Sequence, residues 1–222
     1  MPFRMKSLFR TMVNWSESNR DMQPSGLILA SQSPRRKELL RQIGLKFHII
    51  PSSTDETIVD DVPPADHVRI LAERKARDVA FHLPSGIVLG ADTIVVIDGE
   101  ILQKPVSKDD AVRMLQRLSG QRHEVYTGYS LLEIPTWRRA TEFVKTEVWF
   151  QKLSTEEILA YVNSGSPMDK AGGYGIQDDF GAVFVERING DYYNVVGLPL
   201  SHFYCTFMKF IKNGSPQGEE EI

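Results

Sequence analysis

The segment 31–36, with the sequence SQSPRR, carries the clearest pattern of residues that could bind an anion. It follows a short apolar run, 27–30, and a serine before a proline is typical of a helix cap followed by the first helical residue. Free backbone amides at a helix start attract anions, and arginine binds phosphate oxygens in a bidentate way. The pattern predicts a phosphate site, and a capped surface helix with solvated arginines is the alternative. The predicted contacts are Ser31, Ser33, Arg35 and Arg36.

A single acidic residue, Asp92, lies within an otherwise mostly apolar stretch, 87–97. Burying an unpaired carboxylate costs several kcal/mol, so Asp92 must be paired, bound to a metal or placed where a strand meets a cleft. Gly90 and Ala91 leave space for something to approach closely. Asp92 is therefore a candidate to bind Mg²⁺ or to orient a water molecule. The alternative is a carboxylate that only caps a loop.

Three further charged side chains could face the same cleft. Glu56 lies in a loop rich in serine and threonine, where a carboxylate can reach a metal ion. Lys75 lies close to the apolar stripe of a predicted helix and could contact a phosphate, and Lys104 precedes a proline that stiffens its backbone. For each of the three, a solvated surface position is the alternative.

A glycine-rich segment, 167–177, places Asp169, Lys170 and Gln177 between a predicted helix and a predicted strand. Its glycines permit the backbone to approach a ligand closely. Gln177 offers both a hydrogen-bond donor and an acceptor, which suits the imide edge of a pyrimidine. A flexible surface loop is the alternative.

The elements that must position these residues follow from hydrophobic periodicity and capping signals. The clearest helix covers 65–83, where apolar residues recur at steps of three and four. Capping serines at 33, 107 and 154 open three more helices, and a last helix is expected over 198–211. Strands are expected over 27–30, 47–50, 87–97, 101–102, 122–133, 139–150, 183–188 and 192–196. Crossover and hairpin connections in one chain predict an α/β domain with a mixed sheet covered by helices.

The composition excludes some classes of partner. The chain has 222 residues, of which 26 are basic and 29 acidic, so its net charge is −3 and its pI is near 6.0. With no global positive field, we expect neither a stable nucleic-acid partner nor an anionic membrane surface. No apolar run reaches the roughly 20 residues that span a bilayer, and the start of the chain lacks a signal-peptide core. We therefore expect a cytoplasmic protein.

The two ends of the chain differ in composition from the middle. We expect residues 1–26 to form a flexible N-terminal extension, with an organelle presequence as the alternative. Residues 27–212 should form the folded domain, and 213–222 a disordered acidic tail. The single cysteine, Cys205, lies among aromatic residues and is expected to be a buried thiol.

Several familiar catalytic patterns do not occur in the sequence. It contains no G-x-x-x-x-G-K-[ST] loop, no G-x-G-x-x-G after a strand, no H-E-x-x-H helix and no G-x-S-x-G elbow. Walker-type hydrolysis, simple Rossmann dinucleotide binding, zincin proteolysis and α/β-hydrolase chemistry therefore lose their main support.

Taken together, the ordered motifs resemble those of the Maf family of nucleotide pyrophosphatases. Any one of them is weak, but they occur in the family's order from residue 27 to about 212 and cover nearly all of the predicted domain. The matching pieces are Leu29-Ala30-Ser31-Gln32-Ser33-Pro34-Arg35-Arg36, Asp55-Glu56, Leu71-Ala72-Glu73-Arg74-Lys75-Ala76, Gly90-Ala91-Asp92-Thr93, Lys104-Pro105, Leu118-Ser119-Gly120 and Met168-Asp169-Lys170-Ala171-Gly172-Gly173-Tyr174-Gly175-Ile176-Gln177.

The resemblance implies a metal-dependent cleavage of nucleoside triphosphates to monophosphate and pyrophosphate. The residues 174–177, YGIQ, are similar to the branch that acts on dTTP and UTP, including modified pyrimidine analogues. By position, Asp92 would be the proton acceptor, and Arg35, Thr93 and Gln177 would set specificity. The resemblance also implies an elongated fold like that of the inosine triphosphate pyrophosphatases, a site in a cleft, a homodimer and a link to cell division.

The residues themselves are consistent with that chemistry. A nucleoside triphosphate carries about four negative charges, which clustered arginines and lysines with Mg²⁺ or Mn²⁺ can neutralise. Asp92 would hold the metal, activate a water, or do both, with Glu56 as a second carboxylate. Two alternatives are a nucleotide-binding regulator of division or septum formation with little turnover, and a phosphatase for another metabolite.

Overall fold

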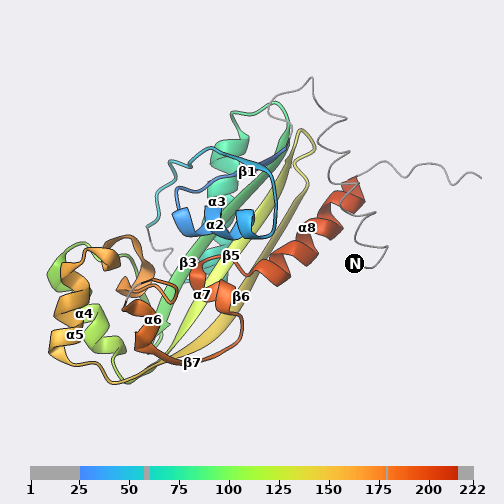
Figure 1. Ribbon diagram of the computed structural model, residues 1–222. Helices are drawn as coiled ribbons and strands as arrows, with labels where there is room; N and C mark the ends of the chain where they lie inside the picture. Colours follow the sequence, from blue (N-terminus) through green and yellow to red (C-terminus); the bar gives the residue numbers. More distant parts are fainter. Residues whose placement is uncertain (1–25, 58–60, 179, 215–222) are drawn as a thin grey trace, which may run out of the picture.

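The protein is represented by a computed structural model that describes residues 26–57, 61–178 and 180–214. Figure 1 shows an elongated arrangement in which long strands join a lobe of short helices at one end to a helix-covered sheet at the other. The predicted extension, except Gly26, and residues 215–222 of the predicted tail lie outside the described residues. No helix in the described part of the chain is long and apolar enough to cross a membrane.

One mixed sheet of seven strands forms the centre of the fold. The strand order is β2-β1-β3-β5-β6-β7, and β4 also pairs with β3. β1 runs parallel to β2 and β3, and the other pairs are antiparallel. The predicted mixed sheet is therefore confirmed. The strands are β1 (Leu27–Leu29), β2 (Phe47–Ile49), β3 (Gly86–Ile97), β4 (Glu100–Leu102), β5 (Arg122–Ile134), β6 (Arg139–Phe150) and β7 (Val185–Asn189).

Helices cover both faces of this sheet. α3 packs on one face, α2 and α8 lie against the other, and α4 and α5 pack against each other in the lobe at one end (Figure 1). The predicted caps Ser33, Ser107 and Ser154 are confirmed, each accepting a hydrogen bond from a first-turn amide. The helices are α2 (Pro34–Gln42), α3 (Pro64–Ala80), α4 (Lys108–Leu118), α5 (Thr155–Asn163), α6 (Gly181–Phe184), α7 (Tyr192–Val196) and α8 (Leu200–Gly214), with 3-10 turns η1 (Ser166–Asp169) and η2 (Ala171–Gly173).

The alternation of side chains along the strands separates two apolar layers. Leu29 joins the cluster beneath α2 and α8, whereas its neighbour Ile28 joins the cluster beneath α3. In β3, Ala91 belongs to the first layer and Val88 to the second. Because side chains on a strand alternate with a period of two, the even-numbered residues of β3 face α3, and the odd-numbered residues lie on the other face, toward α2 at 87–91 and toward the lobe of α4 and α5 at Val95 and Ile97.

The structure corrects three sequence-based expectations. Residues 192–196 form helix α7 rather than a strand, because the Asp191 side chain accepts hydrogen bonds from the amides of Tyr193 and Asn194 and so caps a helix. Cys205 is exposed rather than buried, since it lies on the outer side of α8. Residues 213 and 214, expected in the acidic tail, belong to the end of α8.

Candidate active site

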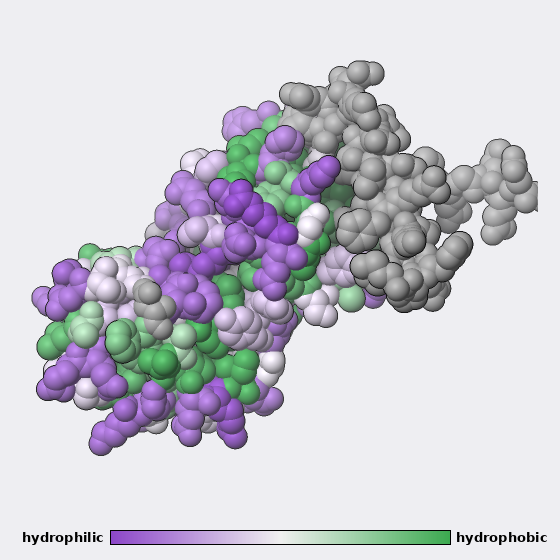
Figure 2. All heavy atoms as spheres, in the orientation of Figure 1, coloured by the Kyte–Doolittle hydropathy of each residue, from purple (hydrophilic) through white to green (hydrophobic). Residues whose placement is uncertain are grey.

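A gap in the edge of the sheet defines the site. β5 covers one edge of β3 from Gly86 to Val96. On the other edge, β1 pairs only with Ile87–Leu89 and β4 only with Val95–Ile97, so among the described residues no strand pairs with that edge at 90–94. A cavity of about 730 Å³ opens at this position. Figure 2 shows hydrophilic side chains gathered on the part of the surface around α2 and beside the helical lobe.

All of the residues predicted for the site line this one cavity. They come from the loop before α2 and the start of α2, from the segment after β2, from α3, from β3, from the segment after β4 and from η1 and the segments beside η2. Their chemical roles stay predictions, but their convergence is a feature of the fold. The predicted residues in the lining are Ser31, Ser33, Arg35, Arg36, Glu56, Lys75, Asp92, Thr93, Lys104, Asp169, Lys170 and Gln177.

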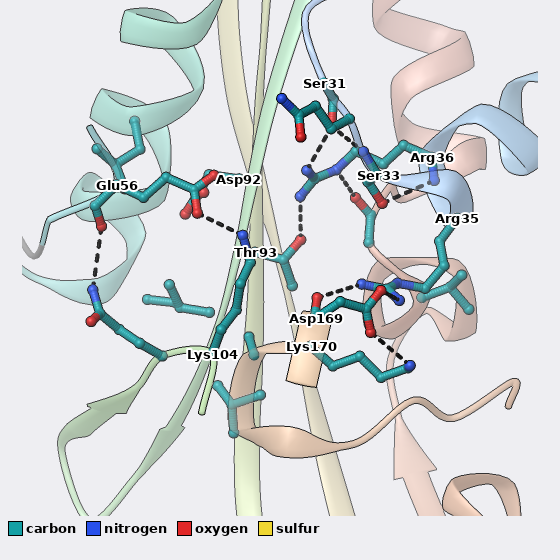
Figure 3. A pocket seen from close by; sticks show the side chains of 18 of the residues that line it. Ser31, Ser33, Arg35, Arg36, Glu56, Asp92, Thr93, Lys104, Asp169 and Lys170 are labelled. Carbon is teal, nitrogen blue, oxygen red and sulfur yellow. Dashed lines mark hydrogen bonds and ion pairs between the residues drawn. The ribbon is translucent and has the colours of Figure 1, made fainter. Parts of the chain in front are cut away.

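Two carboxylates converge on one buried ammonium at the centre of the cavity. Lys75 Nζ on α3 donates to Asp92 Oδ1 and to Glu56 Oε1, each at 2.7 Å. Lys104 Nζ donates to the other Glu56 oxygen at 2.6 Å. The side chains of Lys75 and Asp92 are only 7% and 9% exposed, so their charges interact with little screening. Figure 3 shows Asp92, Glu56 and Lys104 side by side in the cavity.

The environment of Glu56 keeps it ionised. Partial burial raises the pKa of this carboxyl, but hydrogen bonds and charge attraction from Lys104 and Lys75 outweigh burial and bring the pKa to about 2. Glu56 is therefore a carboxylate at any pH at which such a protein works. Asp92 Oδ2 receives no hydrogen bond from a described residue, so this oxygen is free to accept one from a ligand or a water.

The donor set at this centre fits a hard divalent cation. Mg²⁺ in enzymes is bound by one or two carboxylates together with waters and substrate phosphates. Asp92 and Glu56 supply two carboxylates that already share one cation, the Lys75 ammonium. The described residues contain no group of three histidines, cysteines or acids that could hold a metal by themselves. A metal here would therefore need oxygens from the substrate as well.

Arg36 is a buried cross-link between three segments rather than a solvated cation. Its Nε donates to the Gly197 carbonyl at 2.8 Å, Nη1 to Ser31 Oγ at 3.3 Å and Nη2 to Thr93 Oγ1 at 2.9 Å. Burial lowers the pKa of Arg36 from its usual value, and the charge of Asp92 partly offsets this. Each terminal nitrogen keeps a second N–H that can reach a ligand. The side chain thus fixes α2, β3 and the turn after α7 relative to one another (Figure 3).

The serine hydroxyls before α2 accept hydrogen bonds and keep their protons for donation. Ser31 Oγ accepts hydrogen bonds from the amide of Ser33 at 3.2 Å and from Arg36 at 3.3 Å. A hydroxyl has two lone pairs and one proton, so the proton of Ser31 is left to donate into the cavity. Ser33 Oγ accepts from the amide of Arg36 as the helix cap and also keeps its proton. Both hydroxyls therefore suit an anionic oxygen.

Arg35 and Lys170 reach the cavity from opposite sides and meet at Asp169. Arg35 donates to Asp169 Oδ2 at 2.8 Å and to its backbone carbonyl at 2.9 Å, and Lys170 donates to Oδ1 at 2.8 Å. Burial raises the pKa of Asp169, but hydrogen bonds and charge attraction from Lys170 and Arg35 outweigh burial, so the pKa lies below its usual value. The pair of bonds joins the start of α2 to the segment of η1 across the cavity.

The Gln177 amide is available to a ligand. Both of its polar atoms are buried, and neither has a hydrogen-bond partner among the described residues. A buried polar group without a partner costs about 1–3 kcal/mol, so such groups are rare unless something else binds them. The side chain lines the cavity and offers a donor and an acceptor together.

His67, Gln103 and Gly197 are among the lining residues that were not predicted from the sequence. His67 is buried on α3 and precedes Leu71 and Lys75 by four and eight residues, so the helical spacing from Lys75 could have indicated it. Gln103 donates to the Glu56 carbonyl at 3.3 Å. Gly197 accepts from Arg36 and has φ of 128°, a conformation that favours glycine. No sequence signal marks either of these two.

Fold and cavity together define an α/β protein with a polar site for an anion at the edge of its sheet. The chain belongs to the Maf family, since residues 26–210 match the family described as Maf-like protein.

Two curated relatives that are similar to this chain carry the same name. A dTTP/UTP pyrophosphatase of Salinibacter ruber is 56% identical over 180 residues, covering 81% of this chain and 88% of the relative. One of Syntrophus aciditrophicus is 50% identical over 175 residues, covering 79% and 85%. Among solved structures, the Ham1 protein of Staphylococcus aureus has a TM-score of 0.42 at 12% identity, covering 85% of this chain and 99% of that one.

Proposed function

We propose that this protein hydrolyses dTTP and UTP, and modified pyrimidine analogues of them, to the nucleoside monophosphate and pyrophosphate. Relatives at 50% identity and above are named for this activity. The observation that carries the proposal is the buried Asp92 carboxylate, held 2.7 Å from Lys75 in the same cavity as the unpartnered amide of Gln177. A candidate general base and an amide that can pair with the edge of a nucleobase therefore line the same cavity.

The cavity is lined by both cations and carboxylates, so a nucleoside triphosphate would enter it together with a divalent cation. A nucleoside triphosphate brings about four negative charges, which must be compensated for it to enter a partly buried site. Arg35, Lys75, Lys104 and Lys170 all line the cavity, and each is paired there with a carboxylate of Glu56, Asp92 or Asp169. A divalent cation on the carboxylates would leave the four side chains available to phosphate oxygens, and the hydroxyls of Ser31 and Ser33 keep their protons for donation. Preorganised donors of this kind stabilise the charge that develops on phosphate oxygens during transfer.

In this proposal Asp92 acts as the general base. Its free oxygen, Oδ2, would accept a proton from a water that attacks the α-phosphorus. The bond from the α-phosphorus to the bridging oxygen breaks, and that oxygen leaves with pyrophosphate. Lys75 keeps the carboxylate in place, and Lys104 keeps Glu56 beside it. A divalent cation, Mg²⁺ or Mn²⁺, held by Asp92 and Glu56 would neutralise phosphate charge and lower the pKa of its bound water.

Product analysis tests the proposed function. The purified protein is incubated with Mg²⁺ or Mn²⁺ and, in separate reactions, dTTP, UTP, dCTP, dATP or dGTP, and the products are separated by ion-exchange chromatography. We expect monophosphate and pyrophosphate, with dTTP and UTP preferred, and no turnover after chelation of the metal. Release of diphosphate and orthophosphate would overturn the proposal and favour a phosphatase.

The cellular setting of the activity is also part of the proposal. We propose that the enzyme works in the cytoplasm and forms a homodimer. Light scattering of the purified protein tests the homodimer. A regulator of cell division that binds nucleotide with little turnover would keep its cellular effect in an Asp92→Asn variant. An enzyme would lose that effect together with its activity.

A further inference from the structure

A chain of hydrogen bonds runs behind the cavity wall through two threonines. Thr93 of β3 and Thr127 of β5 are paired directly across the two strands, and their hydroxyl oxygens lie 2.9 Å apart. Arg36 Nη2 donates to Thr93 Oγ1 at 2.9 Å. At the other end, Thr127 Oγ1 donates to the backbone carbonyl of Asn194 at 2.9 Å. The chain therefore links α2, β3, β5 and α7.

The two ends of the chain fix its direction. A guanidinium only donates, and a carbonyl only accepts. The one proton of Thr127 is given to Asn194, so in the bond between the threonines it is Thr93 that donates. Thr93 also accepts from Arg36. Its hydroxyl has then used its proton and one lone pair, and one lone pair is left.

The accepting end of the chain is held rigidly. Asn194 is fully buried, and its side-chain amide donates to the Val125 carbonyl and to Thr146 Oγ1, each at 3.0 Å. Thr127 is also fully buried and cannot exchange its partner for water. The hydroxyl of Thr127 therefore has one direction in which to donate, and it imposes that direction on Thr93.

Thr93 is the member of the chain that a ligand can reach. Within β3 from Ile87 to Ile97 it alone is not buried, and it lines the cavity. A phosphate oxygen beside it would place two acceptors against each other. Ser31, by contrast, keeps its proton for donation. The two hydroxyls, both bonded to Arg36, therefore differ in what they offer a ligand: Ser31 offers a proton and Thr93 offers a lone pair.

Given the proposed function, on which this inference rests, we infer that Thr127 is a positioning residue that makes Thr93 an obligate hydrogen-bond acceptor toward the nucleotide. The enzyme would thereby select substrates that present an N–H or O–H at this point. dTTP carries two such groups, the imide N3–H of thymine and the 3′-hydroxyl of the sugar. An analogue with an acceptor at that place meets a lone pair and is rejected.

Three substrates distinguish these groups. In dCTP the N3 atom is an acceptor in place of the N3–H of dTTP. In 3′-fluoro-3′-deoxythymidine triphosphate the imide is kept, and a fluorine that cannot donate replaces the 3′-hydroxyl. We expect the wild-type protein to favour dTTP over at least one of them by tenfold or more in kcat/KM. Equal rates on all three substrates would overturn the inference.

The variant that tests the direction of the chain is Thr127→Val. It removes the hydroxyl and keeps the branched shape, and the Asn194 carbonyl keeps its bond from the amide of Gly197 at 3.1 Å. The Thr93 proton is then free to turn toward the ligand. We expect kcat/KM for the rejected analogue, relative to kcat/KM for dTTP, to rise about tenfold in this variant. The analogue for which it rises identifies the group that Thr93 contacts. Thr127→Ser keeps the hydroxyl and should retain wild-type selectivity.

A purely structural role for Thr127 gives a different result. Thr127→Val would then lower kcat/KM for all three substrates alike, and unchanged ratios overturn the inference. Thr127→Ala, which removes the same hydroxyl, serves where Thr127→Val is not recovered folded.

If the wild-type protein releases no pyrophosphate from dTTP, the proposed function fails. The dissociation constants of dTMP, dCMP and 3′-fluoro-3′-deoxythymidine monophosphate, measured by calorimetry on the same proteins, then decide the inference. A ratio of dissociation constants that Thr127→Val leaves unchanged would overturn it.

Discussion

Asp92 and Thr93 are neighbours in β3, yet their side chains leave opposite faces of the sheet and line the same cavity. Asp92 pairs with Lys75 of α3 on one face, and Thr93 accepts from Arg36 of α2 on the other. Side chains on adjacent strand positions normally serve separate layers. Here the edge of β3 is open between its pairings with β1 and β4, so one ligand space reaches both faces.

Removing the shared ammonium should destabilise the protein. In Lys75→Met the buried Asp92 carboxylate loses its partner, and we expect the free energy of unfolding to fall by about 3 kcal/mol. Urea unfolding measured by circular dichroism checks this. Adding Asp92→Asn to the same protein should restore at least about 1 kcal/mol, because no unpaired charge is left. Lys152→Met, at an exposed position, is the control and should change stability by less than about 0.5 kcal/mol.

Glu56 should make stability depend on pH in the acid range. Its pKa is about 2 in the folded protein, against an ordinary value of 4.5, so the unfolded chain binds the proton first as pH falls. The stabilisation is fully present above pH 4.5 and is lost as the pH falls toward 2. Glu56→Gln lacks this contribution, so the gap in urea midpoint between it and the wild type should narrow from pH 6 to pH 3. A gap of constant size would show that Glu56 is not held ionised.

His123 should add a second pH dependence at a higher range. It is buried beside Tyr174, and burial lowers its pKa to about 3 from 6.5. Between these values the unfolded chain holds a proton that the folded protein does not, so stability falls as pH decreases from 6.5 toward 3. His123→Gln should reduce the slope by up to about 1.4 kcal/mol per pH unit. Replacing the exposed His48 by Gln should leave the slope as in the wild type.

Gln177 should determine which nucleobase the enzyme prefers. In Gln177→Glu the carboxylate accepts but does not donate, so a carbonyl of thymine loses its partner. We expect kcat/KM for dTTP to fall by tenfold or more, and for dCTP to fall less, because the cytosine amino group can donate to a carboxylate. The exposed Gln116→Glu adds the same charge outside the cavity and serves as the control. Parallel losses on both substrates would remove Gln177 from base selection.

Local signals in the sequence predicted much of this fold. An acid inside an apolar strand marked Asp92, and serine caps marked the starts of α2, α4 and α5, because both depend on neighbours within a few residues. The strand expected over 192–196 was wrong because the apolar pattern of so short a segment fits either structure. The capping signal of Asp191 was present, and it decides for the helix.

The partners of the site residues were beyond sequence reasoning. Arg36 stays a predicted phosphate contact, but the partners of three of its N–H groups, Ser31, Thr93 and Gly197, could not be read from the sequence, since Gly197 lies 161 positions away in the chain. The open edge of β3 depends on where β1 stops and β4 starts, which is set by pairing between distant segments. Such features follow from topology rather than from spacing.

The account depends most on Asp92 as the group that takes a proton from water. The direct measurement is the single-turnover rate of pyrophosphate release from dTTP by Asp92→Asn, with the exposed Asp109→Asn as the control for the loss of one charge. We predict a rate at least about a hundredfold below the wild type for Asp92→Asn and an unchanged rate for the control. A wild-type rate in Asp92→Asn, in a protein that still unfolds cooperatively, would contradict the account.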